Sequence, residues 1–303
     1  MRRVGKQMFA NKKGRAGCAL LALFLLAATL GPLLVQDPTD FVALPLSPPS
    51  WAHWLGTTGQ GQDVLAQTVA GASSSLAIGF IVGAAVVIIG ALVGTTAGYF
   101  GGIVDDVLSL IINVFLIMPG LPLMVVIAAY FPAGPVTIGI VLIVTGWAWS
   151  ARVVRSQTLA LRKKDFVLGA IVTGESSARI IVFEILPNMA SLLLSSFIGA
   201  TVYAIGAQVG LEFLGLGDAS QITWGTNLYW ASNDAALLTG SWWTFVPTGL
   251  CVALIGFALA MLNGAIDELN NPRLRSNTAL ARAAKRAGVK LGASTPVLRD
   301  THA

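Results

Sequence analysis

Few residues of this chain have the types and spacing that catalysis or metal binding requires. The two histidines, His53 and His302, do not stand near a group of Cys, Asp or Glu residues with metal-ligand spacing. Asp63 has no histidine or serine partner that the spacing would suggest. No Gly-x-x-x-x-Gly-Lys-Ser/Thr segment occurs, so the sequence predicts no Walker-type ATP site. We therefore expect this chain not to be an enzyme, and to have no catalytic residue, metal site or cofactor of its own.

A basic stretch from Arg152 to Asn188 is the candidate for contact with another molecule. Its apolar residues allow a short amphipathic helix: Phe166, Val167, Ala170, Ile171 and Gly174. Leu186-Pro187-Asn188 then restarts a helix, because proline is tolerated in a first turn. Two interpretations stay open. The stretch is a basic loop anchored on lipid headgroups, or it presents a short helix to a cytoplasmic partner.

Membrane-spanning helices are expected to position this stretch. The chain has 303 residues, of which 55% are hydrophobic and 11% charged, whereas soluble domains carry about 25% charged residues. The mean hydropathy is +0.76. This composition excludes a soluble globular enzyme and a disordered chain. Cys18 and Cys251 both lie in apolar runs, which excludes a disulfide scaffold.

Uncharged runs mark the expected spans, because a helix crosses the ~30 Å hydrocarbon core with about 20 apolar residues. They predict an all-α polytopic fold with six transmembrane helices at 16–36, 74–98, 107–130, 136–152, 185–211 and 235–266. Pro132 and Pro135 separate the third helix from the fourth. The first run is as long as a true span, so we expect an uncleaved helix rather than a signal peptide.

The positive charges predict the orientation. All 19 Lys and Arg residues lie before the first span, between the fourth and fifth, or after the sixth. The positive-inside rule makes these regions, and both termini, cytoplasmic. The segments 37–63 and 212–234 contain acidic residues but no Lys or Arg, and they are expected outside. The basic charge balance therefore reflects topology and not nucleic-acid binding.

Glycines recur along the second predicted span. Gly90, Gly94, Gly98 and Gly102 follow one another at a spacing of four, with Gly79 and Gly83 upstream. In a helix this spacing places small residues on one face, where a second helix can approach closely.

Residues 165–174 and 185–188 resemble the coupling loop of binding-protein-dependent ABC importer permeases, which typically reads Glu-Ala-Ala-x3-Gly and then Ile-x-Leu-Pro. Further stretches resemble the C-type permeases of the dipeptide/oligopeptide/nickel group, in order over about 9–275. They are His53–Thr57 with Gly61–Leu65, Gly98–Gly102 with Asp105, Met118–Pro122, Phe213–Gly217, Trp224-Gly225 and Asn271–Arg275. The sequence departs from the pattern at Leu168 (usually Glu), Gly169 (usually Ala) and Glu184 (often His).

The resemblance implies a type I ABC importer permease fold and a set of ATPase-coupling residues. The implied regions are a basic segment 1–15, a first helix 16–36, an extracytoplasmic segment 37–73, a five-helix core 74–270 with a coupling loop 153–188, and a basic tail 271–303. The implied coupling residues are Asp165, Phe166, Gly169, Ala170, Gly174, Leu186 and Pro187. A plainer interpretation is that Gly174 and Pro187 only shape the loop.

The resemblance also implies partners in a bacterial or archaeal cytoplasmic (inner) membrane. They are a second homologous permease, one or two types of ATP-binding subunit that hold ATP and Mg, and an extracytoplasmic substrate-binding protein. Membrane lipid is a further partner, and nucleic acid is not one. Oligopeptides are the first expected cargo, with oligosaccharides such as cellobiose-type sugars, or nickel, as alternatives. A stand-alone channel or secondary carrier is the rival class, although the span centres lack the ionisable group that a carrier usually has.

Aromatic residues gather at the outer ends of the fifth and sixth spans, at Trp224, Tyr229, Trp230, Trp242 and Trp243. Such residues commonly anchor helices at the membrane interface. The alternative is a surface for the substrate or its binding protein. For that role the candidates are Trp224, Tyr229, Trp230, Asn233 and Asp234.

Overall fold

The computed structural model describes residues 12–270, and within them it is almost wholly helical. The elements are α2 (Lys12–Leu34), α3 (Val64–Phe100), α4 (Gly102–Ile117), α5 (Gly120–Tyr130), α6 (Pro135–Leu161), α7 (Asp165–Val172), α8 (Ser177–Arg179), a π-helical turn η1 (Ile180–Ile185), α9 (Leu186–Asn188), α10 (Ala190–Phe213), α11 (Trp224–Asn233), a 3-10 turn η2 (Trp242–Thr244) and α12 (Val246–Asn270). The predictions for the first 11 residues, for His302 and for the tail 271–303 lie outside the described residues.

Five of these helices are long and apolar enough to cross a membrane: α2, α3, α6, α10 and α12. The pair α4 and α5 makes a sixth candidate, bent by 88°. The all-α fold with six spans is thus confirmed, but the expected single helix over 107–130 is interrupted. Pro119 has no N–H to donate and disfavours a helical conformation at Met118, whose ψ of 134° is extended.

The boundaries of three other spans differ from the prediction. α3 begins at Val64 and not at 74, because Asp63 caps it by accepting a hydrogen bond from the Ala66 N–H at 2.9 Å. α6 continues past 152 to Leu161, so the loop expected at 153–188 starts nine residues later. α12 begins at Val246 and not at 235, after an irregular segment in which Ala235 and Gly240 have positive φ.

The glycine stripe holds α3 against two helices. A Cβ at Gly94 would lie 2.5 Å from the Ala151 carbonyl oxygen, and one at Gly98 would lie 2.7 Å from Thr158, both on α6. Gly79 and Gly83 are covered in the same way by Ile205 and Thr201 of α10. The expected close approach is therefore confirmed, except at Gly102. That residue begins α4 with φ +53° and has open space around it.

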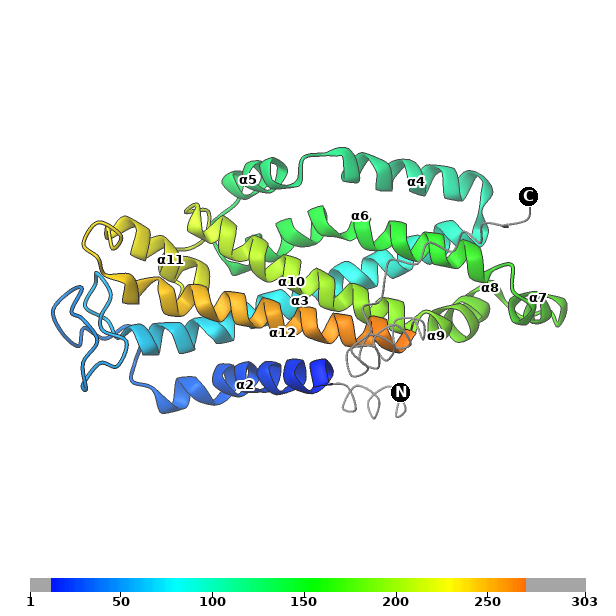
Figure 1. Ribbon diagram of the computed structural model, residues 1–303. Coiled ribbons are helices and arrows are strands. Elements are labelled where there is room, and N and C mark those ends of the chain that lie inside the picture. Colours follow the sequence, from blue (N-terminus) through cyan, green and yellow to red (C-terminus); the bar gives the residue numbers. More distant parts are fainter. Residues whose placement is uncertain (1–11, 271–303) are drawn as a thin grey trace, which may run out of the picture.

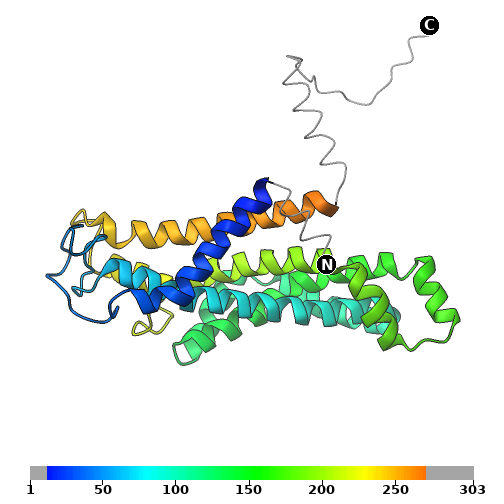
Figure 2. The ribbon, with the colours of Figure 1, turned by 90° about the horizontal axis from the view of Figure 1, so that it is seen from below.

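The bundle has two distinct ends (Figure 1). At one end lie α7, α8 and α9, the start of α2 and the end of α12, where Lys13 pairs with Glu268 at 2.9 Å. At the other end lie α11 and the irregular segment 37–63. Seen from below, α2 crosses the bundle obliquely and passes over α12 (Figure 2). All Lys and Arg residues of the described range lie at the first end or on the half of α6 nearest to it, so we call this the basic end.

Candidate functional site

A short helix, α7, projects at the basic end beyond the long helices (Figure 1). Its Val167 is fully buried and packs with Ile180 and Ile185 of η1 and with Met189, which anchors α7 to the base of α6 and α10. Ala170 is half-buried and packs against the same cluster. The remaining large apolar side chains of α7 are exposed, from 40% at Phe166 to 86% at Val172. An exposed apolar face on such a projection is typical of a surface that binds a partner.

Gly174 ends α7 in a way that only glycine readily allows. Its φ is +80°, its N–H donates to the Ile171 carbonyl at 3.0 Å, and the Glu175 N–H donates to the Ala170 carbonyl at 3.1 Å. These two bonds form a Schellman C-cap. By contrast, a Cβ at Gly169 within the helix would meet no atom within 4 Å. The geometry at Gly174 thus supports the interpretation that this residue shapes the loop, whereas Gly169 faces open space.

The remaining residues predicted for coupling lie close to α7. Asp165 is in the first helical turn, where its negative charge interacts favourably with the positive end of the helix dipole. Leu186 is half-buried and Pro187 is exposed, in the first turn of α9. At Glu184, where the family often has histidine, the main-chain carbonyl accepts a hydrogen bond from the Asn188 side-chain amide at 2.7 Å. The prediction that this set couples to an ATPase is not tested by these positions.

At the opposite end, the predicted outer residues separate into two groups. Trp224 is fully buried; its Nε1–H donates to the Thr68 carbonyl at 3.0 Å, and its ring meets Phe24 edge-on at 6.0 Å. This corrects the expectation that Trp224 is available for contact with the substrate or its binding protein, because a side chain enclosed by α2 and α3 cannot meet a partner. Tyr229 and Asn233 lie at the surface of α11, where Asn233 donates to the Tyr229 carbonyl at 2.9 Å.

Trp230 and Asp234 line one outer pocket of about 200 Å³. Its walls come from the segment before α3, from α11 and from the start of α12, and Asp234 is the charged residue among them. One carboxylate oxygen of Asp234 is buried without a hydrogen-bond partner among the described residues. Burial raises the pKa of the Asp234 carboxyl, and a hydrogen bond from the Gly59 N–H partly opposes this shift.

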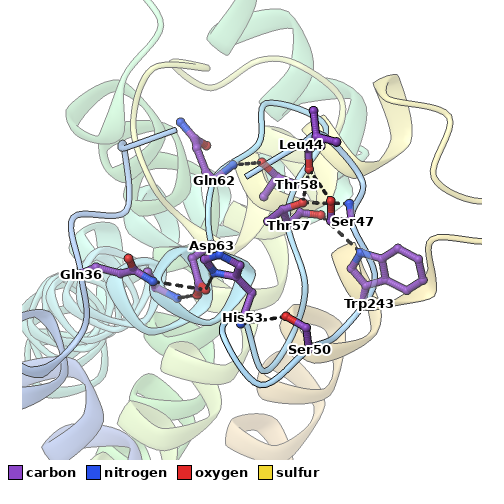
Figure 3. A network of polar contacts seen from close by, with 11 residues as sticks. Gln36, Leu44, Ser47, Ser50, His53, Thr57, Thr58, Gln62, Asp63 and Trp243 are labelled. Atoms are coloured by element: carbon purple, nitrogen blue, oxygen red, sulfur yellow. Dashed lines mark hydrogen bonds and ion pairs between the residues drawn. The ribbon is translucent and has the colours of Figure 1, made fainter. Parts of the chain in front are cut away.

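A histidine–aspartate pair that the sequence interpretation missed secures the segment beside this pocket (Figure 3). His53 Nδ1 donates to Asp63 Oδ2 at 2.9 Å, and the Gln36 amide reaches the same oxygen at 3.5 Å. The Asp63 side chain is 6% exposed. Asp63 therefore does have a histidine partner, contrary to the expectation. The two residues are ten positions apart in an irregular loop, and no regular periodicity relates them, so the sequence hides the pairing.

Comparison with known proteins assigns the chain to a family. Residues 87–275 match the family described as "Binding-protein-dependent transport system inner membrane component". The chain belongs to this family. It is 37% identical over 263 residues to the oligopeptide transport system permease protein OppC of Mycobacterium tuberculosis (strain ATCC 25618 / H37Rv), covering 85% of this chain and 89% of that protein. It is 32% identical over 277 residues to the dipeptide transport system permease protein DppC of Bacillus subtilis (strain 168), covering 89% and 85%.

As a binding-protein-dependent permease, this chain is a multi-pass membrane subunit of an ABC importer. The resemblance stated from the sequence is thereby confirmed, and the chain is a permease subunit, as its relatives are named. The family description implies an ATP-hydrolysing partner and a substrate-binding protein. In the permease, α7 lies at the basic end, and α11, which contributes to the outer pocket, lies at the other end of the bundle (Figure 1).

Proposed function

We propose that this permease imports oligopeptides through a bacterial or archaeal cytoplasmic membrane, with the basic end inside. The observation that carries the proposal is the exposed apolar face of α7, projecting at the basic end of a chain whose similar relatives are named oligopeptide and dipeptide permeases. ATP and Mg would be bound by partner subunits. The Leu168 side chain, where the family has a glutamate, is exposed and extends this apolar face.

We propose that α7 docks in a groove of an ATP-binding subunit. Phe166, Ile171 and Leu168 would fill the groove, and Gly169 would let the two backbones approach closely. Because Val167 is packed between the bases of α6 and α10, movement of α7 would be passed to both helices. The ATPase would then drive transport by binding one permease conformation better than the other.

A second homologous permease would pack against α10. The glycines of α3 are covered within the chain, whereas a Cβ at Gly199, Gly206 or Gly210 of α10 would meet no atom within 4 Å. Uncovered glycines on a membrane helix favour close packing by another helix. The binding protein would dock at the other end, where Trp230 and Asp234 line the outer pocket.

The test is to tag the permease, extract it gently from its native membrane and identify by mass spectrometry the proteins that co-purify. A second permease, Walker-motif ATPases and a binding protein that binds peptides would support the proposal. A binding protein selective for oligosaccharides or for nickel would show that this is the cargo instead of peptides. A lone homo-oligomer that is reproducible in several mild detergents would favour a channel or secondary carrier instead.

A further inference from the structure

The outer pocket has walls whose main side-chain donors are already engaged within the chain. The Gln67 amide donates to the Pro38 carbonyl at 2.6 Å. The Asn227 amide donates to the Gln67 main-chain carbonyl at 3.0 Å, and the Trp230 indole N–H donates to the Ala219 carbonyl at 3.0 Å. Gln67, Asn227 and Trp230 all line the pocket. A group that enters it therefore finds these three donors occupied.

The same hydrogen bonds leave the oxygens of two amides as acceptors. A main-chain carbonyl can only accept, so it identifies the amide nitrogen of Gln67 and of Asn227 and leaves Gln67 Oε1 and Asn227 Oδ1 at the opposite ends. Within residues 12–270 neither oxygen accepts a hydrogen bond, and neither is among the buried polar atoms that lack a partner, so both keep accessible surface. The pocket wall thus offers acceptors rather than donors.

The charge at this end of the molecule has a single sign. Asp234 is the charged residue of the pocket wall. The segments 37–63 and 212–245 contain no Lys or Arg, and their acidic residues are Asp37, Asp40, Asp63, Glu212, Asp218 and Asp234. Such a one-signed surface attracts cations and speeds their approach. The Asp234 charge acts across the pocket without direct contact, because Coulomb interactions extend over several ångströms.

The size of the pocket restricts what can enter it. Its volume of about 200 Å³ is below the ~300–1,000 Å³ of typical small-molecule sites, so it suits one long side chain better than a whole peptide. Lysine and arginine side chains have N–H donors and no acceptor, which matches the acceptor oxygens of the wall. Both cations also bind aromatic rings, and Trp230 lines the pocket while 38% exposed.

We propose that the outer pocket receives a lysine or arginine side chain of the substrate-binding protein. The acceptors available to this cation are Gln67 Oε1 and Asn227 Oδ1, in the field of Asp234 and beside the Trp230 ring. The inference rests on the proposed function, since it assumes that a binding protein docks at this end. It deepens that proposal by naming the group that the pocket recognises.

The experiment measures the affinity of the purified binding protein for the complete importer in nanodiscs, with and without peptide and at several salt concentrations. Ala219 is an exposed loop residue that lines the pocket. Ala219→Arg adds a competing positive charge there, and Ala219→Glu adds a second negative charge. Asp234→Asn removes the charge of the pocket. Asp40→Asn is the matched control, because Asp40 is an exposed acid of the same end that does not line the pocket.

We expect Ala219→Glu to tighten binding and Ala219→Arg to weaken it, with or without peptide. Asp234→Asn should raise the Kd on the order of tenfold at low salt. The difference should shrink at high salt, because ions screen the interaction. Asp40→Asn should change the Kd by about twofold or less, as exposed charges usually do.

Three results would contradict these proposals in distinguishable ways. Affinities that do not follow the sign of the charge at Ala219, or equal effects of Asp234→Asn and Asp40→Asn, would overturn the pocket as the docking point. Unchanged affinity with reduced peptide uptake by Asp234→Asn would overturn it in favour of the amino group of the cargo. No binding of the binding protein to the unaltered importer in either condition would instead overturn the proposed function.

Discussion

At the scale of single residues, two glycines five positions apart show different constraints. Gly174 is held by its positive φ, so most substitutions strain the C-cap of α7 whether or not a partner is present. Gly169 is helical and faces open space. A substitution at Gly169 therefore probes docking, whereas one at Gly174 probes the shape of the loop.

Gly169→Arg should lower co-purification of the ATP-binding subunit by roughly tenfold, equivalent to about 1.4 kcal/mol, because a long charged side chain would stand in the contact face. Membrane insertion should be unchanged. Gly169→Ala is the control, since alanine favours the helix by about 1 kcal/mol and adds little bulk. Equal ATPase recovery from the Arg variant and the unaltered chain would remove Gly169 from the contact.

Gly174→Asn and Gly174→Val form a second pair of variants. Asparagine tolerates positive φ and a β-branched residue does not, so the Asn variant should keep the α7 cap and the Val variant should lose it. Hydrogen exchange of the amides over 165–175 reports the difference. Equal protection in the two variants would argue against the capping role.

His53→Leu should destabilise the outer segment 37–63 by about 1–3 kcal/mol, the cost of leaving a buried acceptor with a missing partner. The affected acceptor is Asp63 Oδ2, which also belongs to the residue that caps α3. His53→Gln retains a donor and should lose less. Limited proteolysis of the segment in intact spheroplasts is the measurement, and equal protease resistance in the two variants would contradict the role of the pair.

Asp234 predicts a pH dependence at the outer pocket. Because burial raises its pKa, the folded chain holds this proton more tightly than the unfolded chain does. Stability relative to Asp234→Asn should therefore fall as the pH rises from the ordinary carboxyl value through the raised one, and then level off. Thermal unfolding of both proteins, measured upward from a pH below about 3.9, the ordinary pKa of aspartate, gives the comparison. A difference in stability between the two proteins that does not change with pH would contradict the predicted dependence.

At the scale of elements, α4 is attached to the bundle by few buried groups. Ile112 is its buried residue. Its polar connections to α6 are a forked ion pair in which Arg155 donates to Asp105 at 2.5 and 2.7 Å, and a hydrogen bond from Arg152 to the Asn113 side-chain oxygen at 2.6 Å. A charge-assisted fork of this kind is stronger than a neutral hydrogen bond. The bend at Pro119 then carries α5 in a different direction from α4.

Asp105→Asn should loosen α4 by about 1–3 kcal/mol, because one charged partner of a two-bond contact is lost. Hydrogen exchange over 102–117 should accelerate while α3 stays protected. The exchanged pair Asp105→Arg with Arg155→Asp should restore part of the protection. No change in exchange on α4 in the single variant would show that its other contacts hold it without the ion pair.

At the scale of the whole molecule, the charge distribution predicts which end faces the cytoplasm. In a background with Cys18→Ala and Cys251→Ala, we expect Ser50→Cys to react with a membrane-impermeant thiol reagent in intact cells. Ser176→Cys should react only after permeabilisation. Both positions are exposed, at opposite ends of the bundle. The reverse pattern of labelling would invert the topology.

The spans and the basic end could be predicted from the sequence because hydropathy and charge are properties of contiguous residues. The same holds for the glycine contacts of α3, where a spacing of four already places Gly94 and Gly98 on one face. The interruption at Pro119 was also present in the sequence, as a proline within an apolar run. Because the run around it contains no charged residue, the sequence predicted a single continuous helix there.

Only the tertiary structure decided which polar and aromatic residues meet. Trp224 and Trp230 are six residues apart on one short helix, yet one is enclosed by α2 and α3 and the other lines a pocket. His53 meets Asp63 through an irregular loop, and the Trp224 indole donates to the Thr68 carbonyl from 156 positions away. Such contacts depend on how distant elements pack, and no local pattern of residue types encodes them.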